Sequence, residues 1–347
     1  MDREVAKMRK ALWTTAAALI LSLAFMLLPG FSAWFSGHIS LPLASLISRA
    51  AASGSWPVGE VMLLAGAPVL ILLLLWSAVR RRAPRGPAFA LALVFLVYAV
   101  LWVPLCHVPA MEVEPYETWR LMKLSRTLAD QAESLRAEAM DAQDSPGETL
   151  AMARDAVAAL DLTALPLQKP KFSRYPQILR ALKIAGLYSP WTGEAIVSPD
   201  EPAFTLPFLA SHELAHAAGI AREDEANYAA YRACMTGNVR FQYAGTIYAL
   251  RYSMDALRAI DMDKWFDIRR ELSDGVRSDF TRIDDLGDSS TGFAAFSDRA
   301  AEAFLRLSGQ PAGLSSYTGV VNFLLADVSL VENPETLQRE DAVQYID

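Results

Sequence analysis

The apolar residues of the chain are concentrated in three long runs near its N-terminus. The runs cover residues 11–28, 61–79 and 87–105, and each has 18 or 19 residues without a formal charge. A helix of about 20 apolar residues can cross the hydrocarbon core of a bilayer, which is roughly 30 Å thick. A buried core helix is the alternative for any one run, but three such runs within the first 105 residues favour three transmembrane helices.

Basic residues flank these runs unevenly, and their distribution predicts how the chain crosses the membrane. Four precede the first run and four lie between the second and third, whereas the loop 29–60 contains only Arg49. The positive-inside rule places the N-terminus and the arginine-rich loop in the cytoplasm. The third span then exits, so that everything after Cys106 is expected outside. Within the first outer loop, residues 31–51 are amphipathic and are expected to lie on the outer membrane face.

After the third run the pattern changes to charged and apolar positions with helical periods. Residues 116–142 and 148–160 are predicted to form amphipathic helices, and residues 262–325 three or four more. Residues 188–199, which are rich in Trp, Thr, Ile and Val, are the best strand candidate. Residues 328–347 are polar and are expected to form a tail.

Charge divides the chain at the same place. Up to Cys106 there are nine Lys and Arg and three Asp and Glu, whereas the remainder has 23 and 36 and a net charge of −13. Such an acidic surface argues against binding of nucleic acid. We therefore predict a mainly α protein, with a membrane domain in residues 1–106. Residues 107–347 are predicted to form a helix-rich extracytoplasmic domain with a small β element.

One short motif carries recognisable chemistry. The sequence His-Glu-Leu-Ala-His, an H-E-x-x-H pattern, begins at His212 and uses two of the four histidines of the chain. Pro207 before it and Gly219 after it are typical of the first turn and the C-terminal end of a helix. On this helix His212 and His216 share one face and can bind one Zn²⁺ ion. Glu213 can then act as general base toward a metal-activated water. The alternative is a solvated helix that carries these residues by accident.

A catalytic zinc site requires a third protein ligand and an open position. The other histidines, His38 and His107, lie in or beside the predicted membrane part, and Arg222 stands where a longer motif would have a third histidine. The third ligand is therefore expected to be a carboxylate. Glu223 and Glu225, in an acidic cluster seven to nine residues after the motif, are the candidates. An ordinary acidic helix start is the alternative explanation of this cluster.

The segment from Glu223 to Asn227 resembles the E-x-x-[SA]-D segment of the gluzincin metallopeptidases. The resemblance implies that Glu223 binds zinc and that the residue four positions later steadies a metal-binding histidine by a hydrogen bond. Asn227 stands here in place of the usual Asp, so it can accept a hydrogen bond but brings no charge. On this basis Glu223 is favoured as the third ligand, with Glu225 as the alternative.

The strand candidate lies just before the motif. In zinc peptidases generally, an edge strand in that place pairs with the substrate backbone, and strand addition is a common way to hold an extended peptide. Trp191, Thr192, Gly193 and Glu194 are therefore candidate substrate-binding residues, and an ordinary structural strand is the alternative. Several tyrosines follow the acidic cluster; most are expected to pack in the core, and one could donate a hydrogen bond to a developing oxyanion. They are Tyr228, Tyr231, Tyr243, Tyr248 and Tyr252.

Four segments together resemble those of an uncharacterised bacterial family of polytopic membrane proteins, a domain of unknown function that carries an H-E-x-x-H motif. They are Trp191-Thr192-Gly193-Glu194-Ala195, His212-Glu213-Leu214-Ala215-His216, Glu223-Asp224-Glu225-Ala226-Asn227-Tyr228 and Ser316-Tyr317-Thr318-Gly319-Val320-Val321. The resemblance extends over nearly the whole chain. It implies a membrane-anchored, zincin-like protein and names no substrate.

The sequence as a whole predicts a membrane-anchored zinc metallopeptidase of the gluzincin type in a bacterial cytoplasmic membrane. Its expected partners are a peptide or protein substrate outside the cytoplasm and the lipid bilayer. Intramembrane proteolysis is disfavoured, because the motif lies over 100 residues after the last predicted span. A non-catalytic zincin-fold sensor or scaffold is the remaining hypothesis.

Overall fold

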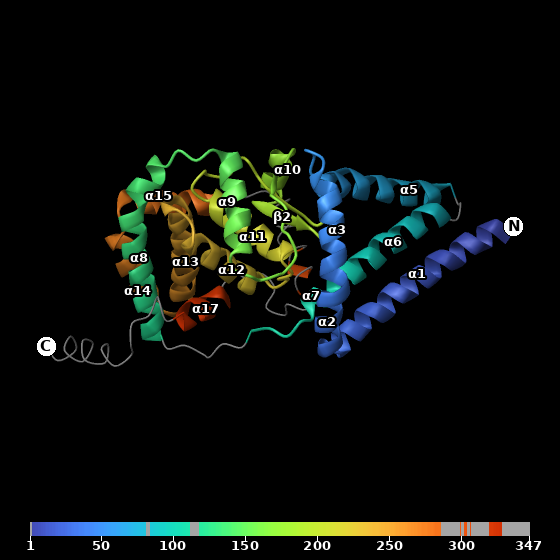
Figure 1. The fold of residues 1–347 in the computed structure, drawn as a ribbon, viewed down its shortest axis with the longest axis horizontal. Coiled ribbons are helices and arrows are strands. Elements are labelled where there is room, and N and C mark those ends of the chain that lie inside the picture. The colour runs from blue at the N-terminus through green and yellow to red at the C-terminus, as the bar shows by residue number, and fades with distance from the viewer. Residues whose placement is uncertain are drawn as a thin grey trace.

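The computed structural model of the chain is mainly helical and elongated, with apolar N-terminal helices at one end and a compact helical body at the other (Figure 1). It describes residues 2–80, 84–111, 118–285 and 319–327, together with the helical positions 299, 302, 303 and 306. The predicted tail 328–347 and the first three residues of the 316–321 motif lie outside the described residues.

The N-terminal part contains three apolar helices and a helical segment between the first two. Its elements are α1 (Asp2–Leu27), α2 (Pro29–Phe35), the π-helical turn η1 (Ser36–Ser40), α3 (Leu41–Ala52), α4 (Val58–Val61), the π-helical turn η2 (Met62–Gly66), α5 (Ala67–Val79), α6 (Arg85–Leu101) and α7 (Val103–Cys106). Met8–Leu27 and Val58–Val79 are long and apolar enough to cross a membrane, by length and composition. They correspond to the first two predicted spans.

The third predicted run, 87–105, is divided between two helices, α6 and α7, and its role as a membrane span stays a prediction. Helix α6 stops before Trp102, and the short α7 follows it. The cause is Pro104, which has no N–H to donate to the carbonyl of Val100 four residues earlier. The hydroxyl of Ser40 donates to that carbonyl instead, at 2.6 Å. The break therefore ties the end of α6 to η1.

The segment from α2 to α3 is an almost continuous helix that lies across the direction of the apolar helices, between them and the helical body (Figure 1). Its side chains have the two-sided pattern expected for residues 31–51. Four serines are buried along it, Ser32, Ser36, Ser40 and Ser48, and large apolar side chains are exposed, Phe31, Trp34, Leu43 and Leu46. The placement of this segment on a membrane surface stays a prediction.

The helical body is built around α13 (Val239–Ile260), which packs along α8 (Thr118–Asp141). Its other helices are α9 (Pro146–Ala158), α10 (Pro176–Ala181), α11 (Leu206–Ala217), α12 (Glu223–Met235), α14 (Met262–Glu271), α15 (Asp274–Asp285) and α17 (Val320–Ala326). Leu121, Leu124 and Leu128 recur at intervals of three and four on α8 and are buried in the core. The helices predicted at 116–142 and 148–160 thus correspond to α8 and α9.

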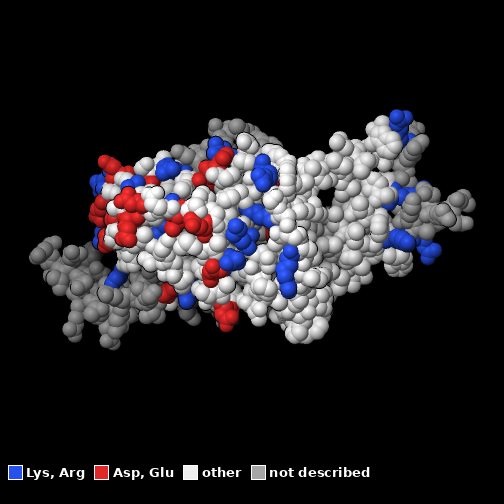
Figure 2. Space-filling model, turned by 45° about the horizontal axis from the view of Figure 1, so that its top comes forward, with Lys and Arg blue, Asp and Glu red and all other residues white. Residues whose placement is uncertain are grey.

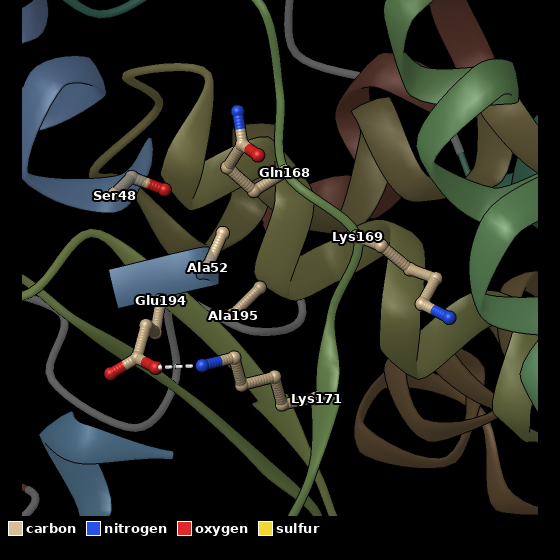
Figure 3. A pocket seen from close by; sticks show the side chains of 7 residues that line it. All are labelled: Ser48, Ala52, Gln168, Lys169, Lys171, Glu194 and Ala195. Carbon is tan, nitrogen blue, oxygen red and sulfur yellow. Dashed lines mark hydrogen bonds and ion pairs between the residues drawn. The ribbon is translucent and has the colours of Figure 1, made fainter. Parts of the chain in front are cut away.

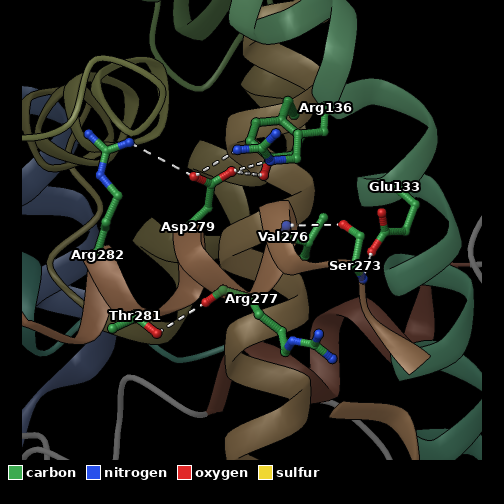
Figure 4. A network of polar contacts seen from close by, with 9 residues as sticks. Glu133, Arg136, Ser273, Val276, Arg277, Asp279, Thr281 and Arg282 are labelled. Atoms are coloured by element: carbon green, nitrogen blue, oxygen red, sulfur yellow. Dashed lines mark hydrogen bonds and ion pairs between the residues drawn. The ribbon is translucent and has the colours of Figure 1, made fainter. Parts of the chain in front are cut away.

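A buried carboxylate holds α15 against α8 and α13. Asp279 is only 1% exposed, and it accepts hydrogen bonds from Arg136 at 2.7 Å and from the hydroxyl of Tyr243 at 2.6 Å (Figure 4). A second arginine, Arg282, lies 3.9 Å away. Because the charge is paired and hydrogen-bonded, its burial is tolerated. The hydroxyl of Tyr243 therefore makes a core hydrogen bond, and Tyr243 is not the tyrosine that could stabilise an oxyanion.

The sheet has three short strands in the order β1-β3-β2: β1 (Lys171–Phe172), β2 (Gly186–Ser189) and β3 (Glu194–Val197). β1 is parallel to β3, and β2 is antiparallel to it. The single strand predicted at 188–199 is therefore wrong, since the segment is a hairpin. Gly193 adopts φ +62° in its turn, and its N–H donates to the carbonyl of Ser189 at 2.8 Å. Among the described residues, β2 is an edge strand and β3 is central.

An ion pair at the start of β3 joins the sheet to the N-terminal helices. Glu194 accepts hydrogen bonds from the N–H groups of Gly59, at 2.7 Å, and Val58, at 3.3 Å, in the first turn of α4. Its carboxylate also pairs with Lys171 at 2.9 Å (Figure 3). The ammonium of Lys171 donates to the carbonyl of Ala51 in the last turn of α3, at 2.8 Å. The negative Glu194 thus lies at the N-terminal end of α4, and the positive Lys171 lies at the C-terminal end of α3. Both positions are favoured by the helix dipole.

A second carboxylate, this time from α4, makes a contact in the opposite direction, toward the sheet. Glu60 of α4 is fully buried and accepts hydrogen bonds from the N–H of Arg174, at 2.8 Å, and from the hydroxyl of Ser173. Both partners directly follow β1. Glu60 and the Lys171–Glu194 pair together fix the sheet to the beginning of the apolar helix Val58–Val79.

Glu194→Gln is expected to destabilise the protein by about 3 kcal/mol, because removing one partner of a buried ion pair leaves the other charge uncompensated. The measurement is the midpoint of thermal unfolding in detergent. The matched control is Asp155→Asn, which breaks the exposed Arg154–Asp155 pair and is expected to change the midpoint little. Equal midpoints for both variants would contradict the role of the Lys171–Glu194 pair.

Candidate metal centre

The H-E-x-x-H motif lies on α11, whose ends are formed as the sequence predicts. Pro207 lies in the first turn of the helix. Gly219, just after the C-terminal end of the helix, has a φ of +107°. The N–H of Gly219 donates to the carbonyl of His216 at 3.0 Å, and that of Ile220 to the carbonyl of Ala215 at 3.1 Å. These two bonds form a Schellman turn, with Ile220 packed against the apolar cluster that contains Ala215. The turn requires the left-handed backbone that glycine adopts most readily.

This turn also orients one histidine. The carbonyl of Ile220 lies 2.7 Å from Nδ1 of His216. A carbonyl can only accept a hydrogen bond, so Nδ1 carries the proton. In the neutral ring, Nε2 then presents its lone pair to whatever lies beyond it. The helix end therefore sets the tautomer of His216.

Three donor atoms converge beyond α11. The Nε2 atoms of His212 and His216 are 3.1 Å apart. An Oε2 atom of Glu223, the first residue of α12, lies 3.2 Å from the former and 3.7 Å from the latter. The three side chains are 7–12% exposed. His212, His216 and Glu223 form a group that could hold a metal ion.

The spacing of these atoms is close to that of a tetrahedral metal site. Bonds of about 2.0–2.2 Å from one zinc ion give ligand–ligand edges of roughly 3.3–3.6 Å. The observed edges of 3.1, 3.2 and 3.7 Å are near this range. Two imidazoles and one carboxylate are also the donor set of catalytic zinc sites that keep a fourth position open. The residues present therefore fit a zinc ion.

The charges of the cluster are strongly coupled. Burial alone would raise the pKa of Glu223, but the adjacent imidazoles hold it far below its usual value. Burial lowers the pKa of His216, but the negative charge of Glu223 and its hydrogen bond more than offset this and raise the pKa to about 9. The carboxylate of Glu223 is thus ionised and ready to bind a cation.

Glu213 lies beside the cluster and is 5% exposed. Burial raises the pKa of its carboxyl group to about 7, although both histidines act in the opposite direction. A pKa near neutrality suits a residue that takes up and returns a proton. Gly186, at the start of β2, makes room for this side chain: a Cβ there would lie 2.6 Å from Oε1 of Glu213. Sequence reasoning missed Gly186, because its role is a close approach between distant segments.

The structure separates the two candidate third ligands. Glu225 lies two residues further along α12, and its carboxylate accepts a hydrogen bond from the N–H of Met111 at 2.9 Å. It also lies 3.4 Å from the guanidinium of Arg222. Burial raises the pKa of Glu225. Glu223, not Glu225, therefore joins the histidines among the described residues.

The role implied for Asn227 is not seen. Its carbonyl oxygen accepts a hydrogen bond from the hydroxyl of Tyr252 at 3.2 Å, and the described contacts include no hydrogen bond from it to either histidine. The reason is that α12 directs Asn227, which is 1% exposed, toward α13, while Ile220 already occupies Nδ1 of His216. Burial, and to a lesser degree the charge of Glu223, raise the pKa of Tyr252.

The four predicted substrate-strand residues also have another role. Thr192 and Gly193 lie in the hairpin turn. The indole N–H of Trp191 donates to the carbonyl of Val94 in α6 at 3.2 Å, and Glu194 caps α4. These residues hold the hairpin to the N-terminal helices instead of lining a free edge. The strand beside the centre is β2, whose Tyr188 has its ring 6.4 Å from that of His216.

The N-terminal helices form part of the wall of the centre. The ring of Trp102, just after α6, meets that of His216 edge-on at 5.8 Å. Trp102 also packs against Tyr188 and belongs to a buried cluster that includes Ala221 of the loop between the ligands. Beneath the same loop, a Cβ at Gly219 would lie 2.9 Å from a methyl group of Leu41 in α3.

A family described as "Protein of unknown function (DUF3810)" has a model that matches residues 35–325. The chain belongs to this family. No curated protein and no solved structure matches it. The DUF3810 segment begins within α2 and ends within α17. The family unit therefore includes α3, α6 and α7 together with the candidate metal centre, and the predicted division at residues 106 and 107 is not a boundary of DUF3810.

Glu223→Ala is expected to weaken zinc binding by about 10-fold or more, because two imidazoles remain. The matched control is Glu225→Ala, which removes a carboxylate from the same helix start but not from the donor cluster, and is expected to leave the affinity nearly unchanged. The measurement is competition with a zinc-chelating dye. Exchanged phenotypes would identify Glu225 as the ligand, and wild-type affinity in both variants would exclude this cluster.

Proposed function

We propose that this DUF3810 protein is a membrane-anchored zinc metallopeptidase of the gluzincin type. The observation that carries the proposal is the set of three donor atoms at spacings of 3.1–3.7 Å with the buried carboxyl group of Glu213 beside them. His212, His216 and Glu223 would hold the zinc ion. The bound ion would polarise a peptide carbonyl and make a water molecule more acidic.

Glu213 does the proton transfer in this proposal. Its carboxylate is buried beside the donor cluster and can accept a proton from the attacking water as general base. The hydroxide adds to the carbonyl carbon, the C–N bond breaks, and Glu213 returns the proton to the leaving amine. Gly186 keeps the space that Glu213 needs.

The edge of β2 is the proposed place for the substrate backbone. The N–H of Ser198 donates to the carbonyl of Ala185. Along an antiparallel pair of strands, every second residue forms such hydrogen bonds with the neighbouring strand. By that alternation Ala185 and Leu187 pair with β3, whereas the backbone groups of Gly186 and Tyr188 point away from it. These two residues flank the centre, so an extended peptide added to this edge would pass Glu213 and His216.

Wild-type protein is expected to contain about one zinc per chain, and Glu213→Gln is expected to keep the zinc and lose hydrolysis, because an amide cannot accept the proton. The measurements are metal analysis and mass spectrometry of a peptide mixture after incubation. His212→Ala is the control that loses the metal. A folded wild-type protein without zinc would refute the metal site. Zinc without hydrolysis would favour the alternative function, a zincin-fold sensor or scaffold.

We further propose that α1, the helix Val58–Val79 and α6 span a bacterial cytoplasmic membrane, with the N-terminus in the cytoplasm. Two of these helices have sufficient length and hydropathy, and the positive-inside rule supplies the orientation. Reporter fusions at Pro84 are expected to report the cytoplasm and fusions after Asp347 the opposite side. A cytoplasmic C-terminus would reverse the topology and place the centre in the wrong compartment for this proposal.

A further inference from the structure

We infer that the substrates of this site are polypeptides anchored in the same membrane and cut close to its outer surface. The inference rests on the proposed function and names its substrate class. It follows from where the donor cluster lies relative to the apolar helices, and from how rigidly that position is fixed.

The centre lies next to residues expected at the membrane–water interface. Trp102 directly follows the apolar helix α6, and Trp56 lies two residues before the apolar helix Val58–Val79. Tryptophan at such helix ends is typical of the level of the lipid headgroups. The ring of His216 lies 5.8 Å from that of Trp102. The metal ligands are therefore about one side chain away from this level.

The ligand-bearing loop rests on the same helices. Gly219 and Ala221, between the last two ligands, pack on Leu41 and on the cluster of Trp102 and Cys106. Leu41 belongs to the crosswise segment α2–α3, which exposes large apolar side chains and lies between the helical body and the apolar helices (Figure 1). Amphipathic segments of this kind lie in the membrane interface. The centre thus faces this plane rather than the far side of the body.

The position is fixed by buried charges, so the centre cannot lift away on a flexible stalk. Glu194, Lys171 and Glu60 tie the sheet that contains β2 to the first turn of the helix Val58–Val79. A folded soluble protein would have to bring its scissile bond down to the headgroups. A chain that emerges from its own membrane anchor passes that level by necessity.

The surface charge agrees with this arrangement. Basic side chains gather on the part of the body nearest to α3, and acidic ones toward its opposite end (Figure 2). Arg174 lies over the exposed ring of Trp56 at 5.6 Å, at the beginning of the apolar helix. Long basic side chains and tryptophan at the end of an apolar helix are typical of the membrane–water interface.

The first test measures position without activity. The protein is loaded with Co²⁺ in place of zinc and placed in nanodiscs, and the relaxation of headgroup phosphorus is followed by NMR. Co²⁺ bound to wild type is expected to accelerate relaxation, whereas His212→Ala, which lacks a ligand, is expected not to. Failure of wild type to bind Co²⁺ would count against the metal site itself. Bound Co²⁺ without faster relaxation of the headgroup phosphorus would overturn this inference but would leave the metal site intact.

The second test measures cleavage in proteoliposomes. One randomised peptide segment is presented in three forms: soluble, next to a transmembrane helix, and on the same helix beyond a rigid helical spacer of about 40 residues, or roughly 60 Å. Cleavage of the membrane-proximal form is expected to exceed that of the other two by about 10-fold or more. Equal cleavage of the soluble or spaced form would refute the inference. No cleavage of any form would refute the peptidase proposal, and this inference with it.

Discussion

The reversal of the chain at Gly219 is the constraint on which the candidate centre depends. Only six residues separate His216 from Glu223, and a continued helix would carry Glu223 roughly 10 Å along its axis. The left-handed backbone at Gly219 turns the chain back instead, so that α12 begins beside the histidines. The same turn gives His216 its carbonyl partner from Ile220 and presents a surface without a side chain to Leu41.

The parts of the site that sequence predicts are those that depend on local spacing. His212 and His216 share a face because they are one helical turn apart, and Gly219 is recognisable as a helix end from its neighbours. The preference for Glu223 over Glu225 agrees with the observed group of His212, His216 and Glu223. Residues two apart on a helix point in different directions, so Glu225 cannot take the same position. Their assignment as zinc ligands remains a proposal. The amphipathic helices of the body follow from the same periodicity.

The parts that sequence does not predict depend on contacts between distant segments. Strands β2 and β3 have four residues each, so their apolar composition reads as one longer strand, and only the backbone of Gly193 reveals the turn. Gly186 matters for the side chain it lacks, which has no local signature. Asn227 fits a family pattern by position, yet a main-chain carbonyl partners His216 and Tyr252 engages the amide.

The packing of the loop between His216 and Glu223 on Leu41 and Trp102 has an evolutionary consequence. Both of these residues precede residue 107, and the DUF3810 match includes them. Replacing the N-terminal helices with another segment would remove Leu41 and Trp102 and expose the apolar side chains of the loop that pack on them. Gene fusion, which readily exchanges tethers among enzymes whose domains fold independently, is therefore a poor route for diversifying this architecture. The helices and the ligand-bearing body are expected to be inherited as one unit.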